Sequence, residues 1–357
     1  MNVRGNCQIL YCLDLAREID LVAAQQRLGT WQRVSFNHKS RVLTGDAVLP
    51  PLRVRFDAKV FSVGPWNTVP TVELALYDLG TLCVTWRIPF DCPLEELVGL
   101  SANLYDNAPL LERSRELAVE LLDSLGSAAQ RPCLSDLVED YFVFEVASLD
   151  GPIESLGTSE RGTLARVLRA EPDELSAQEI EDSLSDFVAY RARETCYVDW
   201  LGAFLCGTNS EDERLVLELA TVELLGLRLL DAQLDTEIND ACDLTGRAST
   251  RSYSLSSQRR ELQRVGSMQA DGAVLHEGID NALKLLGDDY LARLYRTAAE
   301  RFHLNDWDAS IERKLAVLRS VYQSLADFAS HRRSETLEWI IIVLIGVEIA
   351  LYFFPLH

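Results

Sequence analysis

The chain has 357 residues and a mass of 40.0 kDa, enough for two ordinary domains or for one domain with a long helical arm. Apolar residues make up 48% of the sequence and charged residues 25%, a composition that excludes a largely disordered protein. The 55 acidic residues outnumber the 34 basic ones and give a net charge of -21. We therefore do not expect direct, non-specific binding to nucleic acid.

The eight cysteines and the N-terminal segment limit the class of protein further. No two cysteines form a C-x-x-C pair, which argues against a structural zinc site. Several lie in apolar runs, where a thiol behaves as a small buried hydrophobe, so a reducing compartment is favoured. The first twenty residues lack the apolar core of a signal peptide and the arginine-rich, acid-poor character of a transit peptide. We expect the N-terminus to belong to the fold.

Residues 1–207 mix strand and helix signals, which predicts an α+β or α/β domain. The clearest strand signal is a hairpin from Val72 to Phe90, with Gly80 at the turn, where a positive φ is cheap. Further strands are expected at Cys7–Leu15, Leu52–Phe56, Asp140–Val146 and Tyr197–Cys206. Helices are expected at Pro93–Leu104, Leu110–Leu125 and Ala177–Tyr190, the last after a capping box of Ser176 and Glu179.

Residues 208–333 predict a helical stalk, because the strand signals stop at Ser210 and a helical period continues. In its last helix, apolar residues recur at alternating spacings of four and three: Ile311, Leu315, Leu318, Tyr322 and Leu325. This heptad seam is under three heptads long, which favours helix packing within the chain. A coiled coil between copies, and hence a homo-oligomer, is the alternative.

Residues 334–357 contain the apolar run WIIIVLIGVEIALYFF, from Trp339 to Phe354. As a helix the run is about 24 Å long, close to the ~30 Å hydrocarbon core of a bilayer. Arg332 and Arg333 precede it, so we expect one membrane-spanning helix with the body of the protein on the cytosolic side. The alternative is a buried helix of a globular core.

Glu348 is the main candidate functional residue, since a carboxylate inside a hydrocarbon span costs about 2.5 kcal/mol or more. It either contacts another helix or a partner, or it only orients the helix near the lipid boundary. Gly346 forms a small-residue pair with Ala350 on the roughly opposite face, which allows close helix packing. Glu338 and Trp339, just before and at the start of the run, complete the candidates in this helix.

Five segments together resemble the Required for Meiotic Nuclear Division family, whose domain has no known function. They are LYDLGTLCV, ELLGLRLLDAQLD, ALKLLGDDYLARLY, IERKLAVLRSVYQSLADF and LEWIIIVLIGVEI. The resemblance implies an α+β domain, a helical stalk and one C-terminal membrane helix. It also implies support of translation or of assembly at a membrane, as for its mitochondrial members. Because a transit peptide is lacking, the bacterial cytoplasmic membrane is favoured over the mitochondrial inner membrane. The family has no accepted catalytic residues to carry over.

Two functions are open from the sequence. No Gly-rich phosphate loop, G-x-S-x-G or H-E-x-x-H motif is present, so no catalytic residue, cofactor or metal is predicted. The first function is a tail-anchored scaffold or tether that binds a protein partner at the cytosolic face. The second is a membrane-bound enzyme that acts on a nucleotide or phosphate ester. Its site would lie in the N-terminal domain, and a pocket with convergent polar groups there would favour it.

Overall fold

The computed structural model describes residues 1–33, 50–149, 157–191, 194–207, 210–248 and 289–353, with Gly266, Met268 and Ala270. Of residues 148–149, 243–248, 325–338 and 348–353 it describes the backbone alone. Contacts divide the chain into two compact units. The first joins Met1–Leu229 to Val274–Asp306, and the second joins Leu230–Ala273 to Trp307–His357. The boundaries expected from the sequence, at 207 and 333, stay predictions.

The first unit is built on one mixed sheet of nine strands, in the order β11-β12-β13-β10-β1-β8-β7-β4-β3. Only the pairing of β10 with β13 is parallel among these described strands. The strands are β1 Asn2–Asp14, β3 Gln32–Arg33, β4 Leu52–Asp57, β7 Thr71–Leu76, β8 Thr81–Pro93, β10 Val138–Leu149, β11 Phe187–Arg191, β12 Glu194–Val198 and β13 Gly202–Cys206. Two small sheets pair β2 Ala16–Ile19 with β9 Ala129–Pro132, and β5 Ser62–Val63 with β6 Trp66–Asn67.

The helices are α1 Leu21–Leu28, α2 Glu96–Leu104, α3 Ala108–Leu125, α4 Thr158–Leu168, α5 Ala177–Ser183, α6 Glu211–Ala248, α8 Asp289–Arg301 and α9 Leu304–Phe353. Two of these helices begin at a capping residue that the sequence shows. Asp20 caps α1 by accepting from the backbone N–H groups of Val22 and Ala23. Ser176 caps α5 by accepting from the N–H of Glu179, as its capping box predicts.

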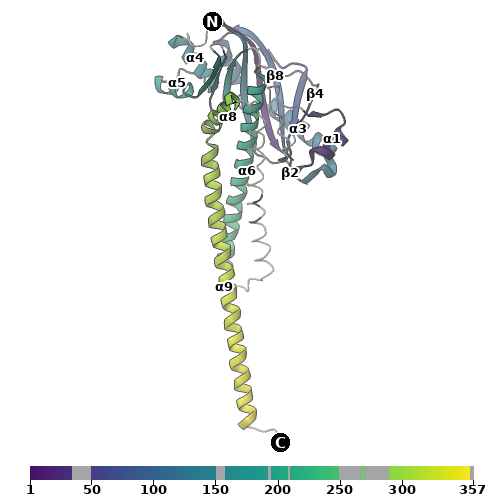
Figure 1. Cartoon of the computed structure of the whole chain (residues 1–357), viewed down its shortest axis with the longest axis vertical. Helices are drawn as coiled ribbons and strands as arrows, with labels where there is room; N and C mark the ends of the chain where they lie inside the picture. Colours follow the sequence, from purple (N-terminus) through teal and green to yellow (C-terminus); the bar gives the residue numbers. More distant parts are fainter. Residues whose placement is uncertain are drawn as a thin grey trace. The chain divides into compact units, whose positions relative to one another are not determined.

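The two faces of the sheet differ in what covers them. Because side chains alternate along a strand, one face carries Trp86, Phe142 and Phe144, which pack with α1 to α4 in the main core. The other face carries Cys12 and Cys83, which pack against α6 in a smaller cluster. In Figure 1, α6 starts beside the strands of the sheet and α8 lies near its first turns. This second face holds the charged residues considered below.

The hairpin expected at Val72–Phe90 is present as β7 and β8, which pair in register from Val72 opposite Trp86 to Leu76 opposite Leu82. Gly80 lies in its turn with a φ of 86°. A Cβ at this position would lie 1.7 Å from the carbonyl oxygen of Ala16. Glycine is therefore required here by both backbone conformation and space.

Two predicted elements differ from the structure. The strand expected at Tyr197–Cys206 is a hairpin of β12 and β13, because Asp199 and Gly202 form a turn between them. The helix expected at Ala177–Tyr190 ends at Ser183, and β11 follows it. The alternating sequence FVAYR fits a strand better than the end of a helix.

The predicted fold class is wrong in its C-terminal membrane helix. No helix in the described part of the chain is long and apolar enough to cross a membrane. The uncharged stretch between Glu338 and Glu348 is nine residues long, 339–347. As a helix it spans about 14 Å. A bilayer core is about 30 Å thick. The predictions of a tail anchor, of a single pass and of a cytosolic body at a bacterial membrane are overturned with it.

Candidate functional site

A cluster of charged side chains lies where the first turns of α6 meet the second face of the sheet. Arg53 and Arg55 are two residues apart on β4 and therefore share this face. Arg55 is opposite Glu73 of β7 in the strand register. The cluster comprises Arg53, Arg55, Glu73, Arg87, Glu145, Arg214 and Glu218, and we call it the arginine cluster.

The centre of the cluster is a bidentate ion pair between Arg53 and Glu218. Arg53 donates from Nη2 to Oε1 of Glu218 at 2.6 Å and from Nη1 to Oε2 at 3.1 Å. The hydroxyl of Tyr77 donates to the same Oε1 at 2.6 Å. The Glu218 side chain has 0% exposure and that of Arg53 has 6%. Such a fork-to-fork pair is strong and geometrically specific, and it fixes α6 to the sheet.

Arg214, one turn earlier on α6, extends the cluster toward β7 and β10. Its Nη2 donates to Oε1 of Glu73 at 3.4 Å, and its guanidinium lies 3.6 Å from Glu218 and 4.0 Å from Glu145. Burial disfavours the charge on Glu73, yet Arg214 and Arg53 outweigh it and lower the Glu73 pKa to about 2. Glu73 is therefore ionised at neutral pH.

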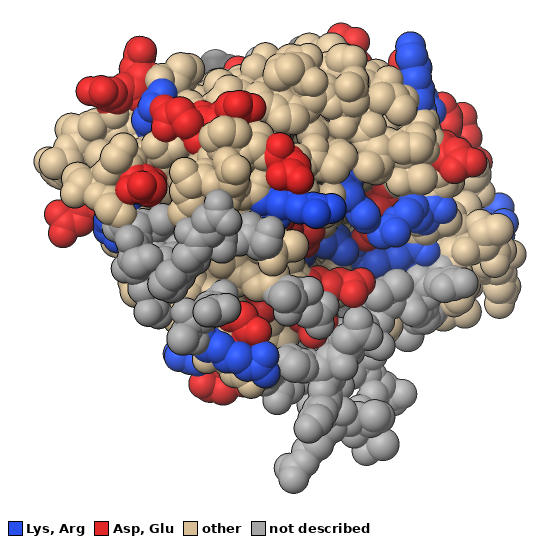
Figure 2. Space-filling view, turned by 90° about the horizontal axis from the view of Figure 1, so that it is seen from above, with Lys and Arg blue, Asp and Glu red and all other residues tan. Residues whose placement is uncertain are grey.

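The cluster contains more positive than negative groups. Four guanidiniums (Arg53, Arg55, Arg87 and Arg214) face three carboxylates (Glu73, Glu145 and Glu218). Burial raises the pKa of Glu145, and the hydrogen bond from Gln8, together with Arg214 and Arg87, offsets this in part. Seen from above, Figure 2 shows basic side chains gathered in a hollow in the middle of the molecule, with acidic side chains among them.

Two nitrogens of the cluster are buried without a hydrogen bond among the described residues: Nε of Arg53, and Nη1 of Arg214, which lies 3.6 Å from Oε2 of Glu218. Both side chains are 6% exposed. A buried donor left unpaired costs about 1–3 kcal/mol, more for a charged group. The geometry of a guanidinium matches the oxygens of a carboxylate or a phosphate.

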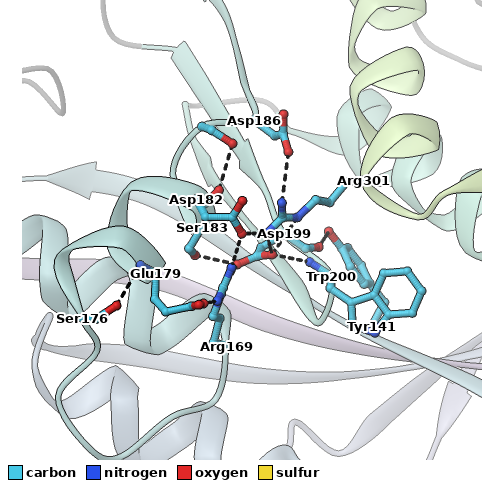
Figure 3. A network of polar contacts seen from close by, with 11 residues as sticks. Tyr141, Arg169, Ser176, Glu179, Asp182, Ser183, Asp186, Asp199, Trp200 and Arg301 are labelled. Carbon is cyan, nitrogen blue, oxygen red and sulfur yellow. Dashed lines mark hydrogen bonds and ion pairs between the residues drawn. The ribbon is translucent and has the colours of Figure 1, made fainter.

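A second network of polar side chains is centred on Asp199 (Figure 3). It differs from the arginine cluster because its central carboxylate accepts hydrogen bonds from several partners. Asp199 is 1% exposed and accepts from Nε of Arg169 at 3.0 Å, from Nε of Arg301 at 2.8 Å and from Oγ of Ser183 at 2.5 Å. Nη2 of Arg301 also donates to Asp199, and the backbone N–H of Trp200 adds a further bond at 2.7 Å. These partners come from the end of α4, the end of α5, the end of α8 and the β12–β13 turn.

Asp182 of α5 joins the same two arginines, at 2.5 Å from Arg169 and 3.0 Å from Arg301. The hydrogen bond from Arg301 is the main cause that lowers its pKa. No buried atom of this network lacks a partner within the described ranges. We therefore regard the Asp199 network as a structural clamp and the arginine cluster as the candidate binding site.

Of the residues singled out from the sequence, none whose side chain the structure describes belongs to either cluster. The side chains of Glu338, Glu348 and Leu325 are outside the described residues. Trp339 is 67% exposed, and a Cβ at Gly346 would have no atom within 4 Å. In the heptad seam, Ile311, Leu318 and Tyr322 are buried and Leu315 is half-buried. The roles proposed for these residues stay predictions.

The arginine cluster was missed because its members are far apart in sequence: Arg53 and Glu218 are separated by 165 residues. One signal was available. Glu218 interrupts the apolar run LVLELA of α6, and Glu73 interrupts VELAL of β7. A charged residue at an inward-facing position of an apolar element needs a partner, because burying an unpaired charge is costly. The sequence does not show which partner.

The fold and its site define a mixed-sheet domain with a buried charged face. The family profile described as "Uncharacterized protein MJ0711, N-terminal domain" matches residues 4–213, so the chain belongs to this family. Among curated proteins it is similar to "Uncharacterized protein MJ0711" of Methanocaldococcus jannaschii, with 24% identity over 251 residues. These cover 69% of this chain and 76% of that protein. No solved structure matches the chain.

These matches correct the identification drawn from sequence segments. The resemblance to the Required for Meiotic Nuclear Division family is wrong, since the matched family is a different one. The matched region contains nearly the whole sheet and ends one residue before Arg214. The family's description assigns no activity, so the biochemical activity is unknown and a function has to be argued from the site.

Proposed function

We propose that this protein binds a small phosphate ester through the arginine cluster. The observation that carries the proposal is the pair of buried guanidinium nitrogens, on Arg53 and Arg214, that make no hydrogen bond within the described residues. A phosphate group presents several acceptor oxygens, and guanidinium groups bind it with charge-assisted hydrogen bonds.

The charge balance of the cluster supports an anionic ligand. Arg87 is half-buried on β8. Its charge acts on Glu145, but no close ion pair joins the two side chains within the described residues. Its strand neighbour is Gln8, whose amide donates to Glu145 at 2.6 Å. Arg87 is therefore the guanidinium of the cluster best placed to be neutralised by a ligand. The overall charge of -21 opposes polyanions such as nucleic acid, so we propose a small ester. Binding alone is proposed, and no reaction is assigned to the cluster.

Isothermal titration calorimetry with phenyl phosphate and inorganic phosphate tests this function. Arg87→Ala should weaken binding by about 10- to 100-fold, because a hydrogen bond to a charged group contributes about 1.5–3 kcal/mol. The control is Arg113→Ala, which removes an arginine of α3 that pairs with Glu116 and Glu120. Absence of binding by the unmodified protein, or equal affinity in Arg87→Ala, contradicts the proposal.

A scaffold that associates with a second copy of the chain is the second candidate. It is favoured by a continuous run of exposed apolar side chains on α9. Each of Trp339, Ile340, Ile341, Ile342, Val343, Leu344, Ile345 and Val347 is at least 50% exposed. Large apolar patches of this kind mark interaction surfaces. The same run occurs on every copy, so copies can cover one another symmetrically.

Light scattering of the full-length protein tests the scaffold function. Ile342→Glu should lower the measured mass toward that of a monomer, because it places a charge in the shared apolar surface. The matched control is Val317→Glu, which places the same charge at an exposed valine of α9 outside the run. A monomeric unmodified protein, or equal masses for both variants, rules this candidate out.

A further inference from the structure

Two cysteines lie directly opposite each other on neighbouring central strands of the sheet. In the antiparallel pairing of β1 with β8, Cys12 is the partner of Cys83. Both thiols are free, have no exposed surface and pack in the small cluster against α6. In the strand pairings within the described residues, no other two cysteines are opposite each other. The arginine cluster contains neither of them.

The backbone hydrogen bonds show that Cys12 and Cys83 form a non-hydrogen-bonded pair. The carbonyl oxygen of Thr81 accepts from the N–H of Tyr77, on the β7 side of β8. Residues two apart on a strand direct their backbone groups to the same edge, so those of Cys83 point toward β7 and away from β1. In a pair of this kind the opposite Cα atoms are about 4.5 Å apart, and the side chains are closer than in a hydrogen-bonded pair.

This spacing suits a disulfide bond. A disulfide joins Cα atoms that are about 4.4–6.8 Å apart and whose side chains point toward each other. Cys12 and Cys83 share one face of the sheet, and a hydrogen bond already joins the two thiols. Oxidation of the pair therefore needs a small movement of the two sulfurs rather than a rearrangement of the strands.

The surroundings of the two thiols keep them reduced while α6 lies on the sheet. Leu219, Val222 and Leu225 of α6 pack in the cluster that contains both cysteines. Burial raises the pKa of both thiols, so little of the reactive thiolate form is present at neutral pH. A local separation of α6 from the sheet would expose the sulfurs to solvent and to an oxidant.

We propose that Cys12 and Cys83 are a reversible modification site, which a low-molecular-weight disulfide oxidises and α6 protects. One cysteine loses its proton and attacks a sulfur of the oxidant, which leaves a mixed disulfide and releases one small thiol. The second cysteine attacks the sulfur of the first, forms the cross-strand bond and releases the second small thiol. The cysteines lose two electrons and two protons, and the oxidant gains them. The site is independent of the phosphate ester site proposed above.

Peptide mass spectrometry of the folded, full-length protein tests this inference. The protein is incubated with 2-hydroxyethyl disulfide, and the remaining thiols are blocked with N-ethylmaleimide. The expected product is a pair of peptides joined through Cys12 and Cys83, which dithiothreitol should separate. Cys7→Ala removes another fully buried thiol of β1 and should give the same product. The inference is overturned if Cys12 and Cys83 stay unlinked, or if they link to other cysteines as often as to each other.

The rate of oxidation tests the role of α6. Tyr77→Phe keeps the ring but removes the hydroxyl that donates to Glu218, which weakens the attachment of α6 to the sheet. It should accelerate formation of the disulfide several-fold. Tyr141→Phe removes another buried hydroxyl, which donates to the backbone oxygen of Asp199, and should leave the rate nearly unchanged. Equal rates in the two variants would overturn protection by α6. Circular dichroism confirms that each variant is folded.

Discussion

Glu218 has no exposed surface, and its carboxylate is held by Arg53 and by the hydroxyl of Tyr77. At the residue scale this pair decides how α6 is fixed to the sheet. Removing one partner of a buried ion pair leaves the other charge buried and uncompensated, which is far more costly than the pair's net contribution.

Glu218→Ala should therefore lower the free energy of unfolding by about 3–5 kcal/mol, measured by urea unfolding. The control is Glu120→Ala, which removes a 63% exposed carboxylate that pairs with Arg113. An exposed pair contributes about 0–1 kcal/mol. A loss for Glu218→Ala no larger than for Glu120→Ala would contradict the buried pair's role.

Asp14, at the end of β1, gives a pH-dependent prediction. Burial raises its pKa to about 7. The unfolded chain releases this proton near pH 3.9, so between about pH 4 and 7 the folded protein holds more protons than the unfolded one. Stability attributable to Asp14 therefore falls as pH rises through this window, by at most about 1.4 kcal/mol per pH unit, and stays reduced above it.

Asp14→Asn removes the titration and should make the protein more stable at pH 8, with no gain near pH 3.5. Urea unfolding at several pH values measures the difference. Asp136→Asn serves as the control, because the side chain of Asp136 is fully exposed. A gain that does not change with pH would show that burial of Asp14 is not its source.

At the scale of elements, the hairpin of β7 and β8 was predictable because its turn residue is dictated by local geometry. Gly80→Ala combines a positive φ with a clash against the backbone of Ala16. We expect a loss of about 3 kcal/mol or more in the free energy of unfolding. Gly29→Ala, with a φ of 54° and no atom within 4 Å of the added Cβ, should cost about 1–2 kcal/mol. Equal losses would refute the steric explanation.

The Asp199 network governs a second element, α8. Its last residue, Arg301, is bound to Asp199, Asp182 and Asp186. Asp199→Ala should accelerate hydrogen exchange of the α8 amides, because it leaves Arg301 without its most buried partner. Asp289→Ala, at the exposed start of the same helix, should leave exchange in α8 nearly unchanged. Similar exchange in both variants would mean that α8 is held by its apolar contacts alone.

Elements whose ends are set by distant contacts were predicted less well than the hairpin. The β12–β13 turn was missed although Asp199 and Gly202 are turn residues, because the surrounding apolar residues read as one continuous strand. The end of α5 at Ser183 was missed because the hydroxyl of Ser183 is bound by Asp199, sixteen positions along the chain. The contact of Ser183 with Asp199 is not visible in a local pattern. The Asp199–Gly202 turn is local, but its signal was outweighed by the apolar residues around it.

At the scale of the whole molecule, composition predicted an ordered chain and local hydropathy predicted a membrane helix, which the described residues do not support. The arginine cluster was not predictable, because it joins β4, β7, β8, β10 and α6 across the fold. Buried charge is the property that the apolar sequence pattern hides and that the three-dimensional structure reveals.

The most direct test of the central claim is the ³¹P NMR spectrum of phenyl phosphate titrated with the full-length protein at about 0.1 M salt, where the Debye length is about 10 Å. The unmodified protein should broaden and shift the phosphorus signal in a saturable way. Arg113→Ala should do the same, whereas Arg87→Ala should have little effect at the same concentrations. An unchanged signal with the unmodified protein, or the same titration with Arg87→Ala, would contradict phosphate ester binding at the arginine cluster.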